Sequence, residues 1–163
     1  LPELCQEWEA ATQPAVDAGI RVVRLRIGVV LSTKGGALQK MLLPFKLYGG
    51  GPLGNGTQYY PWIHMDDLVG GILFAIDNPT VEGPVNLTAP NPVTMDEFAR
   101  ILGEVMSRPS WFRVPSFALK LAVGDAAEAI TASMRAVPDK LIKAGYTFRH
   151  PDLKQALKSI LAE

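Results

Sequence analysis

Apolar residues recur at helical spacing between residues 65 and 76. Their positions follow the i, i+3, i+4, i+7 rule for one face of a helix, so we expect that face to be buried. Asp66 stands at the expected N-cap of this helix, and Asp67 adds favourable negative charge there while facing solvent. A short extended segment with a corner at residues 61–64 precedes the helix. The apolar positions are Met65, Leu68, Val69, Ile72, Leu73 and Ile76.

Residues 20–31 are dense in β-branched side chains and are apolar on both sides. This pattern predicts a central strand of a parallel sheet rather than an edge strand. The residues before it predict a helix over about residues 4–16, which Pro14 should kink or end and Gly19 should follow as a stop. A helix followed by such a strand is half of a βαβ unit, which indicates an α/β fold.

Glycines crowd residues 49–56. A glycine-rich turn that holds a dinucleotide follows a strand and opens a helix. This block instead follows a predicted helix over residues 38–45 and leads into extended residues. We therefore predict a plain loop here, without a phosphate site.

The second half of the chain carries a strong signal for the start of a helix. Thr94 and Glu97 have the spacing of a capping box, and Val93 and Phe98 are placed as its hydrophobic staple. A short strand is predicted before it, over residues 84–88. After it we expect an extended segment over residues 111–115, followed by four helices. These helices cover residues 117–123, a stretch from Asp125, residues 138–145 and residues 151–161.

Composition narrows the range of partners. The chain has 163 residues, of which 48% are hydrophobic, so one compact domain is expected. Sixteen basic and sixteen acidic residues cancel, which speaks against nucleic acid and anionic membrane as partners, and the apolar runs are too short for a membrane span. A single cysteine, Cys5, fits a reducing cytoplasm. The chain opens with Leu1 rather than Met, so we expect a piece of a longer protein.

Five motifs occur in an order that resembles a known family. They are Trp8-Glu9, the strand at residues 25–31, Gly-Gly-Ala-Leu at residues 35–38, Trp-Ile-His-x-Asp-Asp-Leu at residues 62–68, and Ala-Pro-Asn-Pro-Val-Thr at residues 89–94. Together they resemble the extended short-chain dehydrogenases/reductases of the NAD-dependent epimerase/dehydratase family. The similarity is greatest to a branch labelled sugar-nucleotide epimerase or cell-division inhibitor, which carries a C-terminal extension domain.

The resemblance implies an α/β fold that holds the C-terminal part of a Rossmann-type NAD(P)-binding domain and a smaller, mostly helical substrate lobe. Residues 1–88 would form the partial Rossmann layer, interleaved with lobe segments, and residues 89–163 the C-terminal lobe and extension. The intact protein would bind NADP or NAD. By the family pattern, the cofactor would contact the strand at Arg26, Ile27, Gly28 and Val29, and the glycine would permit close approach.

The resemblance also implies epimerase or oxidoreductase activity on a small substrate such as a sugar nucleotide. Tyr60, Trp62 and His64 are the substrate-side candidates. Leu1 and Cys5 occupy the family's catalytic Tyr and Lys positions, so no catalytic residue is named, and no metal is expected. Tyr60 stands where nucleotide-sugar enzymes often carry an arginine for the diphosphate. Two alternatives stay open: a non-catalytic dinucleotide-dependent regulator, and an interaction module that forms a homo-oligomer through an exposed sheet edge.

Several of these residues also have simple structural interpretations. His64, at a strand-to-helix junction, is expected to be a hydrogen-bonded structural group, and Cys5 a small buried hydrophobe. Arg26 lies within an apolar strand and must meet a carboxylate, backbone groups or a ligand if it is buried. The tryptophans are expected in the core: Trp8, Trp62 and Trp111.

Overall fold

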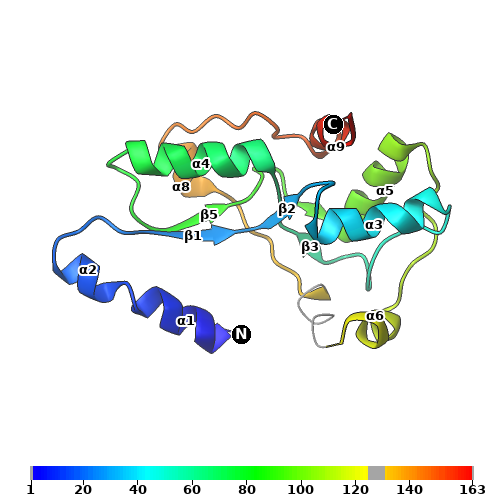
Figure 1. Ribbon diagram of the computed structural model, residues 1–163, viewed down its shortest axis with the longest axis horizontal. Coiled ribbons are helices and arrows are strands. Elements are labelled where there is room, and N and C mark those ends of the chain that lie inside the picture. The colour runs from blue at the N-terminus through cyan, green and yellow to red at the C-terminus, as the bar shows by residue number, and fades with distance from the viewer. Residues whose placement is uncertain (1, 125–130, 163) are drawn as a thin grey trace.

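The computed structural model describes residues 2–124 and 131–162, and it shows an elongated α/β arrangement (Figure 1). The predicted helix from Asp125 begins outside the described residues. Most other predicted elements are present, with shifted ends. The helices are α1 (Pro2–Ala10), α2 (Gln13–Asp17), α3 (Gly36–Lys46), α4 (Met65–Asp77), α5 (Met95–Met106), α6 (Ser116–Val123), α8 (Asp139–Lys143) and α9 (Leu153–Ala162). The strands are β1 (Val23–Ile27), β2 (Val29–Leu31), β3 (Tyr59–Tyr60), β4 (Trp62–His64), β5 (Gly83–Leu87) and β6 (Val93–Thr94).

The strand predicted over residues 20–31 is split at Gly28. Before the split β1 pairs in parallel with β5, and after it β2 pairs in parallel with β4, while β3 and β6 form an antiparallel pair. The split arises because β4 enters between the diverging chains: the Val29 N–H donates to the carbonyl of Pro61 at 2.6 Å, and the Ala89 N–H donates to that of Trp62 at 2.7 Å. The parallel pairing was predicted correctly. The central position was not, since β1 pairs only with β5 among the described strands.

Two hydrophobic clusters stabilise the fold. The first lies among α3, α5 and α9 and includes Leu38, Phe45, Trp62, Phe98, Leu102 and Leu157. The second lies between the β1–β5 pair and the helices α4 and α8, and includes Ile63, Ala75, Val85, Leu87 and Leu141. Both clusters draw side chains from before and after residue 88. The sheet region and the helical lobe are therefore interleaved along the chain.

The start of α5 has the N-cap and the hydrophobic staple that the sequence predicted. The side chain of Thr94 accepts a hydrogen bond from the Glu97 N–H at 3.3 Å, and the staple residues Val93 and Phe98 are both buried. The amphipathic terminal helix is also confirmed, because Leu153, Ala156, Leu157 and Ile160 of α9 are all buried. Residues 49–56 form the predicted loop, with no helix or strand longer than a single bridge at Leu53.

Helix α4 packs with a different face from the one predicted. The helix is buried through Asp67, Gly71 and Ala75, because small residues let its backbone approach β5. A Cβ atom on Gly71 would lie only 2.5 Å from the side chain of Leu87. The predicted apolar face is consequently left in solvent at Met65, Val69, Leu73 and Ile76.

The N-terminal helices extend away from the clusters (Figure 1). Pro14 does not kink one long helix but lies in the first turn of α2, where its missing N–H has no cost. Trp8 is 68% exposed and Cys5 is exposed as well, so their predicted burial was wrong. Trp111 is 78% exposed, with its indole N–H donating to the carbonyl of Tyr48 at 3.0 Å. Of the three tryptophans, only Trp62 is in the core.

Within the described part of the chain, every helix is too short or too polar to cross a bilayer.

Candidate functional site

The diverging strands create a junction at their carboxyl ends. Gly28 follows β1, Thr88 follows β5, and Pro61 precedes β4. A Cβ atom on Gly28 would lie 2.4 Å from the carbonyl oxygen of Pro61 and 3.0 Å from the methyl group of Thr88. The glycine is therefore required by close approach of the chain itself. We call Gly28, Pro61 and Thr88 the strand junction, because ligands of open α/β sheets bind outside the carboxyl ends of the strands.

One wall of the junction is open to solvent. Ile27 is 51% exposed, and Val29 is half-buried. Arg26 is not buried as expected: its side chain is 56% exposed, and its guanidinium donates to both carboxylate oxygens of Glu9, at 2.6 and 2.8 Å. This hydrogen bonding lowers the pKa of Glu9 and raises the pKa of Arg26. Of the three partners proposed for Arg26, the structure shows a carboxylate, and the pair ties α1 to β1.

Two of the substrate-side candidates form the inner side of the junction. Tyr60 and Trp62 are buried, and the ring of Tyr60 meets Phe98 edge-on at 4.8 Å between centroids. Burial raises the pKa of Tyr60 to about 12, so its hydroxyl stays protonated at neutral pH. The Tyr60 hydroxyl and the Trp62 indole N–H make no hydrogen bond to the described residues. Contact of these side chains with a substrate stays a prediction.

His64 has the structural role expected of it. It is the N-cap of α4, in place of Asp66, since its Nδ1 accepts a hydrogen bond from the Asp66 N–H at 3.0 Å. Its ring stacks on His150 at 3.7 Å, and His150 Nε2 lies 3.2 Å from a carboxylate oxygen of Asp66. These three side chains each bring a metal-ligating atom within 4.8 Å of the others. However, imidazole lone pairs lie in the ring planes, and stacked rings do not direct them to one ion, so we interpret the cluster as a helix cap.

The environment of Asp67 differs from the one that the sequence predicted. It was expected to face solvent, yet it is buried and accepts hydrogen bonds from the N–H groups of Arg149 at 2.7 Å and His150 at 2.8 Å. The hydroxyl of Tyr146 also donates to it, and burial together with the charge of Asp67 raises the pKa of Tyr146 to about 12. Asp67 thus fastens the C-terminal segment to α4. An acidic pair at a helix start gives no sign of such a distant partner.

A segment of the C-terminal region crosses the junction, and we call residues 133–137 the strap. The Tyr59 N–H donates to the Ser133 hydroxyl at 3.1 Å, and the Met134 N–H donates to the Tyr59 carbonyl at 3.3 Å. Further along, the Thr88 hydroxyl donates to the carbonyl of Ala136 at 3.4 Å. The guanidinium of Arg135 lies over the ring of Tyr59, 5.7 Å from its centroid. No periodic pattern in the sequence indicated this contact.

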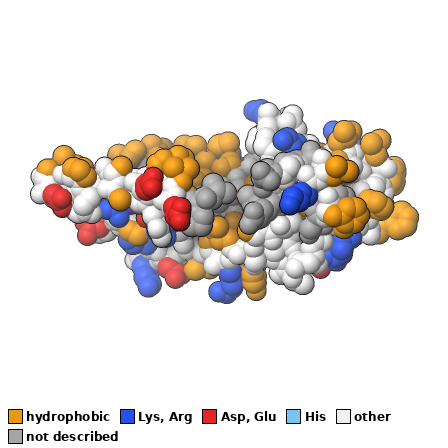
Figure 2. Space-filling model, turned by 90° about the horizontal axis from the view of Figure 1, so that it is seen from below, with side chains coloured by type: hydrophobic (Ala, Val, Ile, Leu, Met, Phe, Trp, Pro, Cys, Tyr) orange, Lys and Arg blue, Asp and Glu red, His pale blue; other side chains and the backbone are white. Residues whose placement is uncertain are grey.

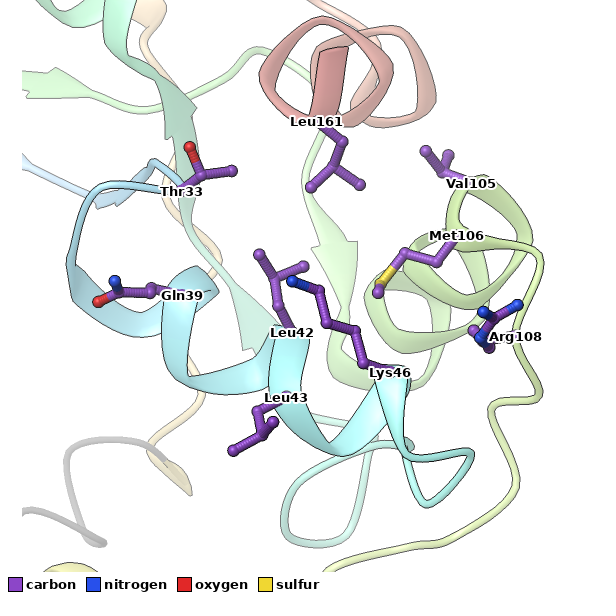
Figure 3. Close-up of a pocket in the computed structure, with 9 residues that line it drawn as sticks. All are labelled: Thr33, Gln39, Leu42, Leu43, Lys46, Val105, Met106, Arg108 and Leu161. Atoms are coloured by element: carbon purple, nitrogen blue, oxygen red, sulfur yellow. The ribbon is translucent and has the colours of Figure 1, made fainter. Parts of the chain in front are cut away.

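A separate open groove of about 570 Å³ lies among α3, the end of α5 and α9 (Figure 3). Lys46 extends along it beside Leu42, while Arg108 lies at its rim over the ring of Tyr48. It shares no residue with the strand junction or the strap, so we treat it as a distinct surface feature. Its lining residues are Thr33, Gln39, Leu42, Leu43, Lys46, Val105, Met106, Arg108 and Leu161.

Comparisons with known proteins agree with this architecture. An "Epimerase family protein SDR39U1 homolog, chloroplastic" from Arabidopsis thaliana is 44% identical over 161 residues, which is 99% of this chain and 46% of that protein. The crystal structure of human epimerase family protein SDR39U1 with NADPH matches with a TM-score of 0.83 and 38% identity, covering 88% of this chain and 49% of that one. Over most of its length the chain is therefore similar to about half of these epimerase family proteins.

Two further matches extend this similarity. A nucleoside-diphosphate sugar epimerase from Corynebacterium glutamicum matches with a TM-score of 0.74 and 37% identity, over 98% of this chain and 30% of that one. A family profile described as a domain of unknown function, DUF1731, matches residues 114–160, which include the strap. The Rossmann-type epimerase fold is thus shown, and the chain spans about half the length of the curated relatives it matches.

Proposed function

We propose that the intact protein binds NADPH or NADH and catalyses an epimerase or oxidoreductase reaction on a small substrate. The observation that carries the proposal is the open wall of the junction, where exposed Ile27 lies at the carboxyl end of a parallel strand. The solved human relative, whose structure contains NADPH, supports it by covering most of this chain at a TM-score of 0.83.

The wall is suited to a flat, partly apolar ring. Ile27 offers an exposed apolar side chain, and the backbone of Gly28 and Val29 lies beside it without a bulky group at residue 28. The Arg26–Glu9 pair holds α1 against the same strand and so fixes one side of the wall. When bound, a nicotinamide would supply hydride transfer. The side chains of this chain would orient it and exclude water from one face.

The substrate proposal concerns the other side of the junction. Tyr60 ends β3 and Trp62 begins β4, so these two residues flank Pro61 of the junction, whereas His64 lies at the far end of β4. Tyr60 remains a neutral hydroxyl at physiological pH. We propose that a small polar substrate approaches these residues across the junction. The alternative, a dinucleotide-dependent regulator without turnover, shares the cofactor site. Measuring product formation by the longer protein with a panel of nucleotide sugars separates the two proposals.

Fluorescence titration with NADPH tests the cofactor site. We expect micromolar affinity for the longer protein that contains this chain, and at least tenfold weaker binding after Ile27→Asp, because a carboxylate opposes an apolar ring and a phosphate-bearing ligand. Leu47→Asp is the matched control, since Leu47 is 72% exposed beyond the end of α3, and it should bind as the wild type does. Equal affinity of the Ile27→Asp variant and the wild type would remove the proposal.

The unpaired edge of β1 supports a second candidate function, an interaction module. Among the described strands β1 pairs only with β5, and an exposed strand edge offers free N–H and carbonyl groups to another chain. We propose that the 163-residue chain alone forms a homo-oligomer through this edge and binds NADPH poorly. Sedimentation equilibrium together with the same NADPH titration tests both parts: a monomer with micromolar affinity for NADPH would contradict them.

The exposed thiol of Cys5 suits a reducing compartment, and we propose the cytoplasm as the location of the protein.

A further inference from the structure

The groove among α3, the end of α5 and α9 lies apart from the strand junction (Figure 3). We propose that this groove binds a free fatty acid, with the alkyl chain along its apolar walls and the carboxylate at its two cationic side chains, Lys46 and Arg108. Its volume of about 570 Å³ lies within the range of roughly 300–1,000 Å³ that is usual for small-molecule sites. The proposal gives the chain a ligand site separate from those for cofactor and substrate.

The walls of the groove are largely apolar. From α3 come Leu42, which is almost fully buried, and Leu43, which is 61% exposed. The other two helices contribute partly buried side chains, Val105 and Met106 from α5 and Leu161 from α9 (Figure 3). An alkyl chain placed among these residues would remove apolar surface from water on both partners, which favours binding.

The ends of two helices bring the two cations to the groove. Lys46 is in the last turn of α3, and Arg108 follows the left-handed C-cap of α5, Ser107, whose φ is 54°. The backbone N–H of Arg108 donates to the carbonyl of Gly103 at 2.8 Å, and its guanidinium lies over the ring of Tyr48, 4.6 Å from the centroid. The chain reversal and the stacking hold Arg108 at the rim of the groove.

The described part of the chain supplies no carboxylate to these two cations. None of the described lining residues is acidic, and Lys46 makes no ion pair or hydrogen bond with the residues that the structure describes. The guanidinium of Arg108 donates to a backbone carbonyl at 3.0 Å, while its buried Nε has no partner among the same residues. Glu104 of α5 is engaged elsewhere, because it pairs with Lys154 at 2.9 Å.

The helix ends themselves set the size of the charge that a ligand meets. The carbonyls at a helix C-terminus carry roughly half a negative charge, so α3 and α5 together offset about one of the two positive charges. About one positive charge remains, which matches a single carboxylate. A phosphate monoester carries about −1.5 to −2 at neutral pH and would leave negative charge uncompensated beside apolar walls. The groove therefore favours a fatty acid over a phosphorylated lipid.

Isothermal titration of the longer protein with dodecanoate, below the concentration at which this acid forms micelles, tests the proposal. We expect saturable binding with micromolar affinity. Dodecyltrimethylammonium has the same chain with a cationic head, and butyrate has the same head with a short chain, so each should bind at least tenfold more weakly. Equal binding of either control compound would remove the charge or the chain from the proposal.

Two variants test the two parts of the groove. Lys46→Met removes the charge but keeps most of the stem, and it should weaken dodecanoate binding at least fivefold. Leu43→Asp should weaken it at least tenfold, because a carboxylate then faces the alkyl chain; both side chains are exposed, so both variants should fold. Lys40→Met is the matched control, since Lys40 is exposed on the same helix outside the groove and its loss should leave the affinity unchanged.

The methyl NMR signal of Met106 gives a readout in the wild-type protein. Dodecanoate should shift this signal along the same saturation curve, because Met106 lines the groove. The proposal is overturned by the absence of saturable binding, by an unmoved Met106 signal, by equal affinity of Lys46→Met and wild type, or by an equal loss in Lys40→Met. Saturating NADPH should not change the affinity for dodecanoate, and competition would place the acid at the strand junction and leave the proposed function standing.

Discussion

The helical cluster among α3, α5 and α9 differs sharply from the surface formed by α1, β1 and the outer face of α4. Both regions carry apolar residues at regular spacing, yet Phe98 and Leu157 are fully buried whereas Trp8, Val69 and Leu73 are exposed. Figure 2 shows hydrophobic side chains on the surface at both ends of the molecule. An apolar face is therefore not buried by its pattern alone, because burial also needs an opposing surface.

The two regions are also held by different interactions. The helical cluster is stabilised by apolar packing, which contributes about 25 cal/mol for each Å² removed from water. The N-terminal region contacts the sheet through polar pairs, Arg26 with Glu9 and Arg24 with Thr12. The guanidinium of Arg21 similarly donates to the carbonyls of Ala75, Ile76 and Val81 around the end of α4. Of these contacts the Arg26–Glu9 ion pair is exposed to solvent, and exposed ion pairs orient elements but stabilise them little.

The largest expected effect tests whether the buried cluster contributes more stability than the exposed N-terminal surface. Phe98→Ala should lower the free energy of unfolding by about 4 kcal/mol, because it leaves a cavity in the helical cluster. Trp8→Ala in the same 163-residue chain should cost under about 0.5 kcal/mol, since the ring is mostly in solvent. Urea denaturation followed by circular dichroism measures both. Comparable losses would show that α1 packs on the body of the molecule more tightly than its exposure indicates.

A smaller effect concerns the contact between α4 and the segment that precedes α9. Asp67→Ala should cost about 2 kcal/mol, because the buried N–H groups of Arg149 and His150 lose their acceptor. Hydrogen exchange at these two amides should accelerate together with the loss of stability. Asp66→Ala is the control on the same helix turn: its carboxylate is half exposed, and its removal should leave both amides protected. Unchanged exchange in the Asp67→Ala variant would contradict the fastening role.

The smallest effect tests a local feature within the helical cluster. Thr94→Ala should cost about 1 kcal/mol, because the Glu97 N–H at the start of α5 loses its partner. Thr94→Ser keeps the hydroxyl and should retain most of that stability. Neither variant should change the affinity for NADPH in the longer protein. A large change in affinity with an unaltered melting temperature would show that the turn before α5 contacts a ligand.

The sequence by itself determined the elements whose signals are local. The N-cap at Thr94, the amphipathic pattern of α9 and the parallel character of the strand β1 depend on neighbouring residues or on strand composition, and all three are as predicted. The role of His64 as a hydrogen-bonded group at a strand end was predicted on the same basis. Five ordered motifs between residues 8 and 94 were enough to indicate the resemblance to epimerase family proteins.

Only the tertiary structure decided which apolar faces are covered and which polar groups meet. Residues separated by more than seventy positions form the contacts of Asp67 with His150 and of Tyr59 with Arg135, and no local pattern encodes such pairs. Gly28 shows the same limit: its sequence context indicated a close approach but could not say whether chain or ligand made it. The face of α4 was misjudged because Gly71 and Ala75 gain burial by their small size rather than by hydrophobicity, which periodicity does not register.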